Sequence, residues 1–125
     1  MERVGRGNKK MPLHRWNEVP KEQITPLLAR QMIHTQTMTI ARIELRKGAA
    51  VPEHAHHNEQ VSIVERGRVK FVIGGVERTL GPGDAAHMPP HVPHWIEVLE
   101  DAVIVDVFAP CREDWKRGDD AYLRK

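Results

Sequence analysis

Short apolar segments, several of which alternate with polar residues, are separated by glycine and proline turns from residue 36 to residue 108. Alternation with a period of two indicates β-strands, because successive side chains of a strand point to opposite faces. Strands at short, regular intervals are typical of a closed all-β barrel or a sandwich. The expected strands cover residues 37–45, 60–65, 69–73, 76–80, 85–88, 95–99 and 102–108.

Several short sequences mark where these strands end. Gly74–Gly75 predicts a two-residue hairpin, since glycine adopts the positive φ that such turns need. Arg66–Gly67 and Glu100–Asp101 are expected to end the strands before them. Residues 19–28 contain two prolines and are expected to be irregular or to form edge structure. No segment predicts a helix of ordinary length, so the expected fold class is all-β, as a closed barrel or a sandwich.

A length of 125 residues is that of one domain. We expect a disordered N-terminal leader over residues 1–15, because chain termini are commonly loose, and a single folded domain over residues 16–125. The 19 basic and 17 acidic residues leave a formal net charge of +2, which does not indicate a nucleic acid partner.

Cys111 is the only cysteine, which excludes a disulfide within the chain and a multi-cysteine zinc site. A chain without an internal disulfide fits a reducing, cytoplasmic location better than an oxidising one. No apolar stretch approaches the length of a membrane span, and the N-terminus lacks the apolar core of a signal peptide. We therefore expect a cytoplasmic protein that does not insert into membranes.

Histidine is the unusual residue type, because five of the eight histidines lie in two short clusters. His54 and His56 are two residues apart, so that on a strand both would point into the barrel. A turn after them would let the next strand bring Gln60 back beside them. The second cluster ends at His94 and can supply a fourth ligand from a neighbouring strand.

Three imidazoles and one side-chain oxygen suit a single divalent ion of the first transition row with open coordination positions. Zinc, nickel, manganese and iron all fit this ligand set. The alternative is that these are polar loop histidines without a metal. Other histidines are not expected to be ligands, because they fall in turns or out of phase with the strand: His57, His87 and His91.

The spacing of glycines, prolines and histidines over residues 48–67 and 83–94 resembles the two signatures of the cupins. That resemblance implies a jelly-roll-like barrel in a single domain, which holds one metal ion on His54, His56, Gln60 and His94. Gln60 stands where most cupins have a glutamate, so the site would carry less negative charge. His91 stands where the second signature usually has a glycine.

Asp106 lies in an expected strand whose two faces are both mainly apolar. A carboxylate is costly there unless it is paired. It is therefore either joined to an arginine in a structural salt bridge or placed for proton transfer with a shifted pKa. The residues alone leave both interpretations open.

The segments HAHHNEQVSIVERG and WIEVLEDAVIVDVFAPCREDW resemble the KdgF-type cupins of pectin and alginate breakdown. This resemblance implies an enzyme that converts a cyclic 4,5-unsaturated uronate, a small sugar acid, into its linear keto form. It implies that Asp106 moves a proton, that Arg112 grips the substrate carboxylate, and that Phe108 forms an apolar wall. Without this resemblance, an equally good interpretation of Arg112 is a solvated charge in an acidic tail.

Two other functions remain open: a metal-dependent dioxygenase or other small-molecule enzyme, and a non-catalytic cupin that binds small acids. Cys111 and Ser62 depart from the family pattern and leave the exact substrate open. The resemblance also implies a homodimer formed by strand exchange, for which residues 24–40 are the candidate region.

Overall fold

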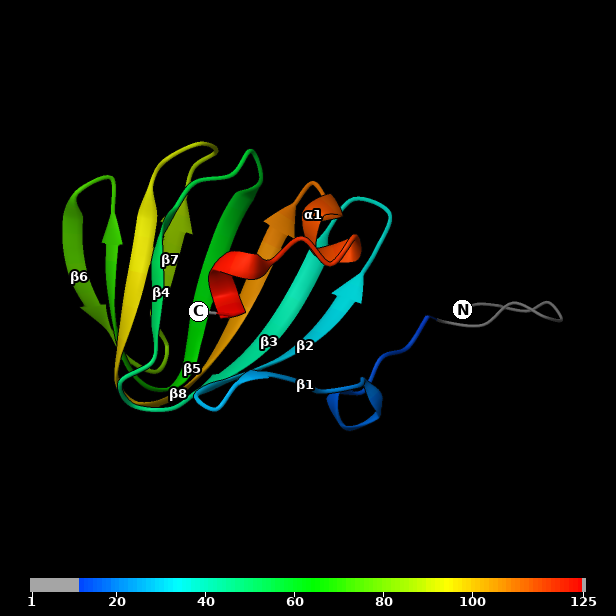
Figure 1. Ribbon diagram of the computed structural model, residues 1–125, viewed down its shortest axis with the longest axis horizontal. Helices are drawn as coiled ribbons and strands as arrows, with labels where there is room; N and C mark the ends of the chain where they lie inside the picture. The colour runs from blue at the N-terminus through cyan, green and yellow to red at the C-terminus, as the bar shows by residue number, and fades with distance from the viewer. Residues whose placement is uncertain (1–11, 125) are drawn as a thin grey trace, which may run out of the picture.

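The computed structural model describes residues 12–124, whose regular structure consists mainly of strands (Figure 1). The helical segments are single turns: η1 (Trp16–Glu18), α1 (Glu113–Lys116) and η2 (Ala121–Arg124). The strands are β1 (Glu22–Thr25), β2 (Leu28–His34), β3 (Thr39–Leu45), β4 (Ala50–His54), β5 (Glu59–Ile73), β6 (Val76–Leu80), β7 (Ala85–Met88) and β8 (His94–Ala109). The expected all-β barrel is confirmed. Most of the predicted leader, residues 1–11, lies outside the described residues.

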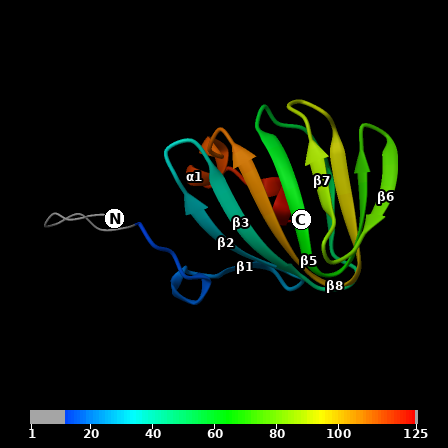
Figure 2. The ribbon, with the colours of Figure 1, turned by 180° about the vertical axis from the view of Figure 1, so that it is seen from behind.

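All strand pairs are antiparallel, in the order β1-β2-β3-β8-β5-β6, with β4 also paired to β8 and β7 also paired to β5. The two long strands β5 and β8 pair with each other along most of their length and join the two halves of the fold. Seen from opposite sides, the strands curve around an interior that the C-terminal segment partly covers (Figures 1 and 2). Such curvature places alternate side chains of β5 and β8 in the interior.

Two of the predicted strand ends are wrong, because β5 and β8 bend together instead of turning back. Glu100–Asp101 lies inside β8, and Arg66–Gly67 lies inside β5, where the pairing register shifts. Gly67 has a φ of 80°, and a Cβ atom there would clash with the carbonyl of Asp101. A shift of register of this kind lets a paired strand bend without ending. Gly74–Gly75, by contrast, forms the expected hairpin, with positive φ at both residues.

The N-terminal part is more regular than expected. β1 is an edge strand, as the prolines around it indicated, but β2 was not predicted. Its first four residues, Leu28 to Gln31, are all buried, so the polar/apolar alternation that marks a half-buried strand is missing. Arg30 and Gln31 are buried because their side chains find partners: Asp120 for Arg30, and the carbonyls of Trp16 and Val19 for Gln31.

The hydrophobic core fills the interior between the two halves, with Phe71, Val98 and Trp115 among its buried members. Within residues 12–124, no helix is long and apolar enough to cross a bilayer.

Candidate metal centre and its cavity

Three imidazoles meet at one end of the barrel interior. His54 is the last residue of β4 and His94 the first of β8, and the two are paired across the strands. His56 lies in the loop after β4, so the prediction that it shares a strand with His54 is wrong. The three residues nevertheless bring one ring nitrogen each within 4.8 Å of one another. Gln60 reaches the same place from β5.

Each of the three rings is oriented by a backbone carbonyl close in sequence. The Nδ1 atoms of His54, His56 and His94 lie 2.8, 2.9 and 2.9 Å from the carbonyl oxygens of residues 52, 58 and 92. A carbonyl accepts only, so each Nδ1 carries the proton and donates it. The Nε2 atoms are then left with free lone pairs, the orientation that a metal-ligating histidine needs.

Two of these lone pairs receive no hydrogen bond from the residues that the structure describes. Nε2 of His94 is buried and has no hydrogen-bond partner among the described residues. Nε2 of His56 lies 3.1 Å from Oε1 of Gln60, where two acceptor atoms would face each other. Burial lowers the pKa of His54 and of His56 to about 4, so both rings are neutral at pH 7. A divalent cation between these atoms would satisfy all of them, and the residues present fit such an ion.

A chain of hydrogen bonds leads from this cluster to the buried carboxylate of β8. Gln60 donates from Nε2 to the hydroxyl of Ser62 over 3.0 Å, which directs its Oε1 toward the histidines. The hydroxyl of Ser62 donates to Oδ1 of Asp106. Because Ser62 and Asp106 are register partners on β5 and β8, the pairing of these strands places them side by side.

Asp106 has no cationic partner: within residues 12–124, no Lys, Arg or His nitrogen lies within 4.0 Å of its carboxylate. The interpretation of Asp106 as one half of a salt bridge is therefore wrong. Burial raises the pKa of Asp106 to about 6, against the opposing effect of its hydrogen bond from Ser62. The group can thus exchange a proton near neutral pH.

Arg112 is buried and is not a solvated tail charge, since only 2% of its side chain is exposed. Its Nε and Nη2 donate to the two carboxylate oxygens of Asp114 over 3.0 and 2.8 Å. The guanidinium carbon lies 4.7 Å from the ring centre of Phe108 and 4.1 Å from that of Trp115. The tail folds back because this pairing and stacking compensate for the burial of the charge.

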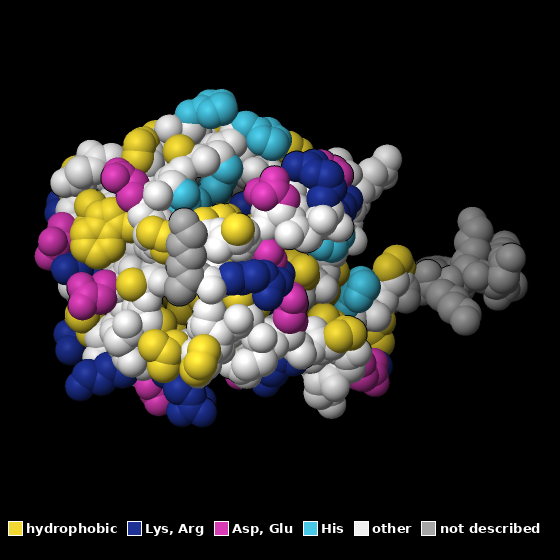
Figure 3. Space-filling model, in the orientation of Figure 1, with side chains coloured by type: hydrophobic (Ala, Val, Ile, Leu, Met, Phe, Trp, Pro, Cys, Tyr) yellow, Lys and Arg dark blue, Asp and Glu magenta, His cyan; other side chains and the backbone are white. Residues whose placement is uncertain are grey.

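The other histidines of the two sequence clusters lie outside. His57, His87 and His91 are exposed, and His87 contacts Glu59 over 2.6 Å on the outer face. In the surface view, histidine side chains gather at the end where the loops after β4 and β7 lie (Figure 3). Within the described residues, only His54, His56 and His94 form a group of metal-binding geometry.

A cavity of about 50 Å³ lies beside the cluster. Among the residues that line it are those predicted as site residues: His54, Gln60, His94, Asp106, Phe108 and Arg112. Tyr122 also lines the cavity, and its ring centre lies 4.7 Å from that of His54. No local sequence pattern marks Tyr122 or Asp114, because both reach the site only when the tail folds back.

Known proteins resemble this chain in sequence and in structure. The pectin degradation protein KdgF of Dickeya dadantii is 29% identical over 102 residues, which cover 79% of this chain and 93% of that protein. The structure of KdgF from Halomonas sp. superposes with a TM-score of 0.75 at 29% identity, over 79% of this chain and 93% of that one. An RmlC-like cupin from Shewanella frigidimarina superposes with a TM-score of 0.79 at 32% identity, over 85% of this chain and 96% of that one.

The family described as Cupin domain matches residues 41–108, which run from β3 to the end of β8 and include all four residues around the cluster. The strand topology, the histidine cluster and this match agree, and the chain belongs to the cupin domain family.

Proposed function

We propose that this protein is a metal-dependent enzyme that converts a cyclic 4,5-unsaturated uronate into its linear keto form. One observation carries the proposal: an unpaired carboxyl, Asp106, and a buried guanidinium, Arg112, line the same cavity as His54 and His94. The likeness to two KdgF proteins, one named for pectin degradation, supports a sugar acid as the substrate class.

The ligands in this proposal are Nε2 of the three histidines and Oε1 of Gln60. A divalent ion, which we propose to be zinc, nickel, manganese or iron, supplies a Lewis acid that holds oxygen atoms of the sugar acid. Because all four ligands are neutral, the site keeps a positive charge that favours an anionic substrate. Arg112 also lines the cavity and, beside its pairing with Asp114, offers N–H donors to the substrate carboxylate.

The reaction is an isomerisation in which no atom is gained or lost. The anomeric hydroxyl of the cyclic uronate loses its proton and becomes the aldehyde as the bond to the ring oxygen breaks. The ring oxygen leaves as an enolate, which becomes the ketone when the alkene carbon C4 gains a proton. Asp106 is the group in the cavity that can take the first proton and deliver the second.

The surroundings of Asp106 support this role. The carboxyl is held by Ser62, so it faces a fixed position in the cavity. Phe108, two residues later on the same strand, is buried and forms an apolar wall beside it. Such a wall excludes water from the reacting atoms and strengthens the interactions of the charged groups.

The test is the loss of alkene absorbance when purified protein is mixed with 4,5-unsaturated galacturonate or guluronate. We expect the wild type to consume the alkene and Asp106→Ala to be slower by at least about a hundredfold, the usual contribution of a general acid–base group. Glu77→Gln, which removes an exposed carboxylate on β6, is the matched control and should keep full activity. A wild-type protein that leaves the alkene untouched would contradict the proposal.

Elemental analysis of the same samples separates chemistry from metal binding. Asp106→Ala should retain the metal content of the wild type. The double variant His54→Ala, His94→Ala should lose most of it, since two of four ligands are gone. Unchanged metal in the double variant would contradict the ligand assignment.

The alternative of a non-catalytic cupin that binds small acids predicts binding of the uronate without loss of the alkene, and a dioxygenase predicts consumption of oxygen. The same assay, run with an oxygen electrode, separates all three. The homodimer and the cytoplasmic location stay predictions.

A further inference from the structure

The C-terminal segment, residues 120–124, lies against the cavity. It includes η2, which contacts β1 on one side and β4 on the other (Figure 1). Tyr122 and Leu123 from this segment line the cavity, and Leu123 is buried. The segment thus forms one wall of the site, although it comes last in the chain.

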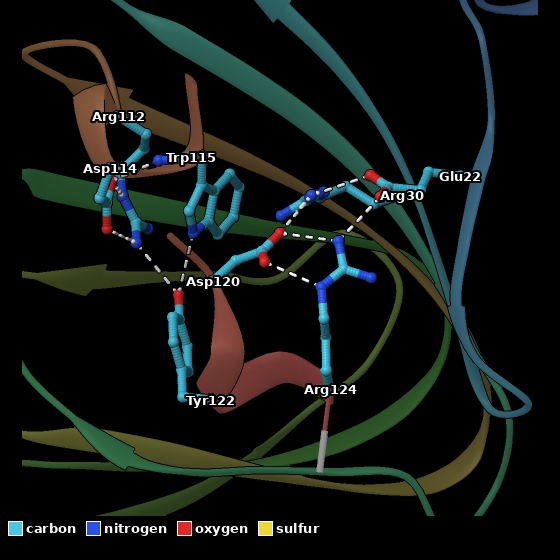
Figure 4. A network of polar contacts seen from close by, with 8 residues as sticks. All are labelled: Glu22, Arg30, Arg112, Asp114, Trp115, Asp120, Tyr122 and Arg124. Carbon is cyan, nitrogen blue, oxygen red and sulfur yellow. Dashed lines mark hydrogen bonds and ion pairs between the residues drawn. The ribbon is translucent and has the colours of Figure 1, made fainter. Parts of the chain in front are cut away.

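Four charged side chains hold this segment down (Figure 4). Asp120 accepts from Nη2 of Arg30 over 2.7 Å, and both side chains are 2% exposed. Arg124 donates to Asp120 over 2.9 Å and to Glu22 over 2.8 Å, and it is largely exposed. The contact of Arg30 with Asp120 is therefore buried, whereas the contacts of Arg124 are open to water.

The closed segment leaves too little room for a sugar acid. The cavity of about 50 Å³ is well below the volume of roughly 300 Å³ at which small-molecule sites begin. A six-membered ring sugar acid therefore enters only if part of the wall moves. The strands of the barrel are fixed by their ladders, whereas residues 120–124 are held by side chains alone.

Movement of residues 120–124 would free N–H groups of Arg112 that can bind a carboxylate. A guanidinium binds a carboxylate through two parallel N–H groups, either Nε with Nη2 or Nη1 with Nη2. Asp114 occupies the first pair. Of the second pair, Nη2 donates its other proton to the hydroxyl of Tyr122 over 3.0 Å, while Nη1 has no hydrogen-bond partner among residues 12–124.

We propose that residues 120–124 are a lid, and that the hydroxyl of Tyr122 occupies the position on Arg112 that the carboxylate of a sugar acid takes when the lid opens. The hydroxyl keeps the buried guanidinium satisfied in the closed state. It is held there by a second hydrogen bond, from Nε1 of Trp115 over 3.2 Å. The inference rests on the proposed function for the identity of the carboxylate ligand.

Calorimetric titration of the full-length protein with D-galacturonate, with and without added Zn²⁺, tests the exchange on Arg112. This saturated sugar acid carries the carboxylate but lacks the reactive alkene. Tyr122→Phe keeps the ring but removes the competing hydroxyl, so we expect galacturonate to bind roughly threefold to tenfold more tightly. A merely structural role of Tyr122 would give weaker binding. Arg117→Gln, an exposed residue outside the lid, is the control and should bind as the wild type does.

Hydrogen exchange of residues 120–124 tests the lid in the wild type without any substitution. Galacturonate should speed exchange in this segment at least severalfold and leave the paired strands β5 and β8 unchanged. Unchanged exchange at saturating galacturonate would overturn the lid. Unchanged or weaker binding by Tyr122→Phe, or no binding by either protein, would overturn the exchange on Arg112.

These outcomes are separate from those of the alkene assay. Consumption of the alkene together with no effect of Tyr122→Phe on binding leaves the proposed function standing and overturns the exchange on Arg112. Tighter binding of galacturonate by Tyr122→Phe, with faster hydrogen exchange in residues 120–124 but without consumption of the alkene, contradicts the proposed reaction and supports both the exchange on Arg112 and the lid.

Discussion

Two buried aspartates, Asp106 in the barrel and Asp120 in the tail, have opposite electrostatic surroundings. Asp106 is 7% exposed and receives a hydrogen bond from a neutral hydroxyl, and burial raises its pKa to about 6. Asp120 is 2% exposed and lies between two arginines. The hydrogen bond from Arg124 and that from Arg30 lower the pKa of Asp120 against the effect of burial.

The difference separates a reactive carboxyl from a structural one. A buried carboxyl without a cation is costly to ionise, and its proton affinity suits acid–base chemistry near neutral pH. A buried carboxylate with arginine partners is ionised at all physiological pH values and contributes to stability. Burial alone therefore does not say which aspartate is functional.

The largest expected effect on stability comes from removing the carboxylate of Asp120. Asp120→Ala leaves Arg30 buried with only the half-exposed Glu22 beside it, and should lower the free energy of unfolding by about 3 kcal/mol. Urea unfolding at pH 7 measures this. Asp119→Ala, next in the chain but exposed, is the matched control and should change stability by less than about 0.5 kcal/mol. An equal loss of stability in Asp120→Ala and Asp119→Ala would contradict the structural role of the buried carboxylate.

At acidic pH, the difference in the free energy of unfolding between the wild type and Asp120→Ala should become smaller. The pKa of Asp120 is lower in the folded protein than its value of about 3.9 in an unfolded chain. Its contribution to stability is therefore present above pH 4 and is lost as the pH falls through the lowered pKa. Urea unfolding of both proteins at pH 7 and at pH 3 is the measurement. A gap that stays constant over this range would show that ionisation of Asp120 does not matter.

The smallest expected effect is that of Asp106→Asn on stability. This change removes a buried carboxylate that forms no salt bridge within residues 12–124, while the amide oxygen can still accept from Ser62. At pH 7 we expect no loss of stability and a gain of up to about 1 kcal/mol. Thermal unfolding in the absence of metal tests this. A loss of several kcal/mol would mean that Asp106 has a structural role like that of Asp120.

Sequence reasoning recovered the fold class, the hairpin at Gly74–Gly75 and the residues that converge around the cluster. These features depend on residues that lie close together in the sequence, and both turns and alternating strands have recognisable residue patterns. It missed β2, because a strand that is buried on both faces shows no alternation. It also placed a turn at Glu100–Asp101, because a bend shared by two long strands and a chain reversal use the same residue types.

The sequence by itself determined an all-β barrel and a group of histidines with a glutamine, since both follow from residue spacing along single strands and turns. Only the tertiary structure decided that Asp106 has no salt-bridge partner within residues 12–124, that Arg112 is buried against Asp114, and that Tyr122 lines the cavity. These facts depend on how the tail folds back over the barrel. That path is set by contacts between residues far apart in the chain, such as Arg30 with Asp120, which no local pattern encodes.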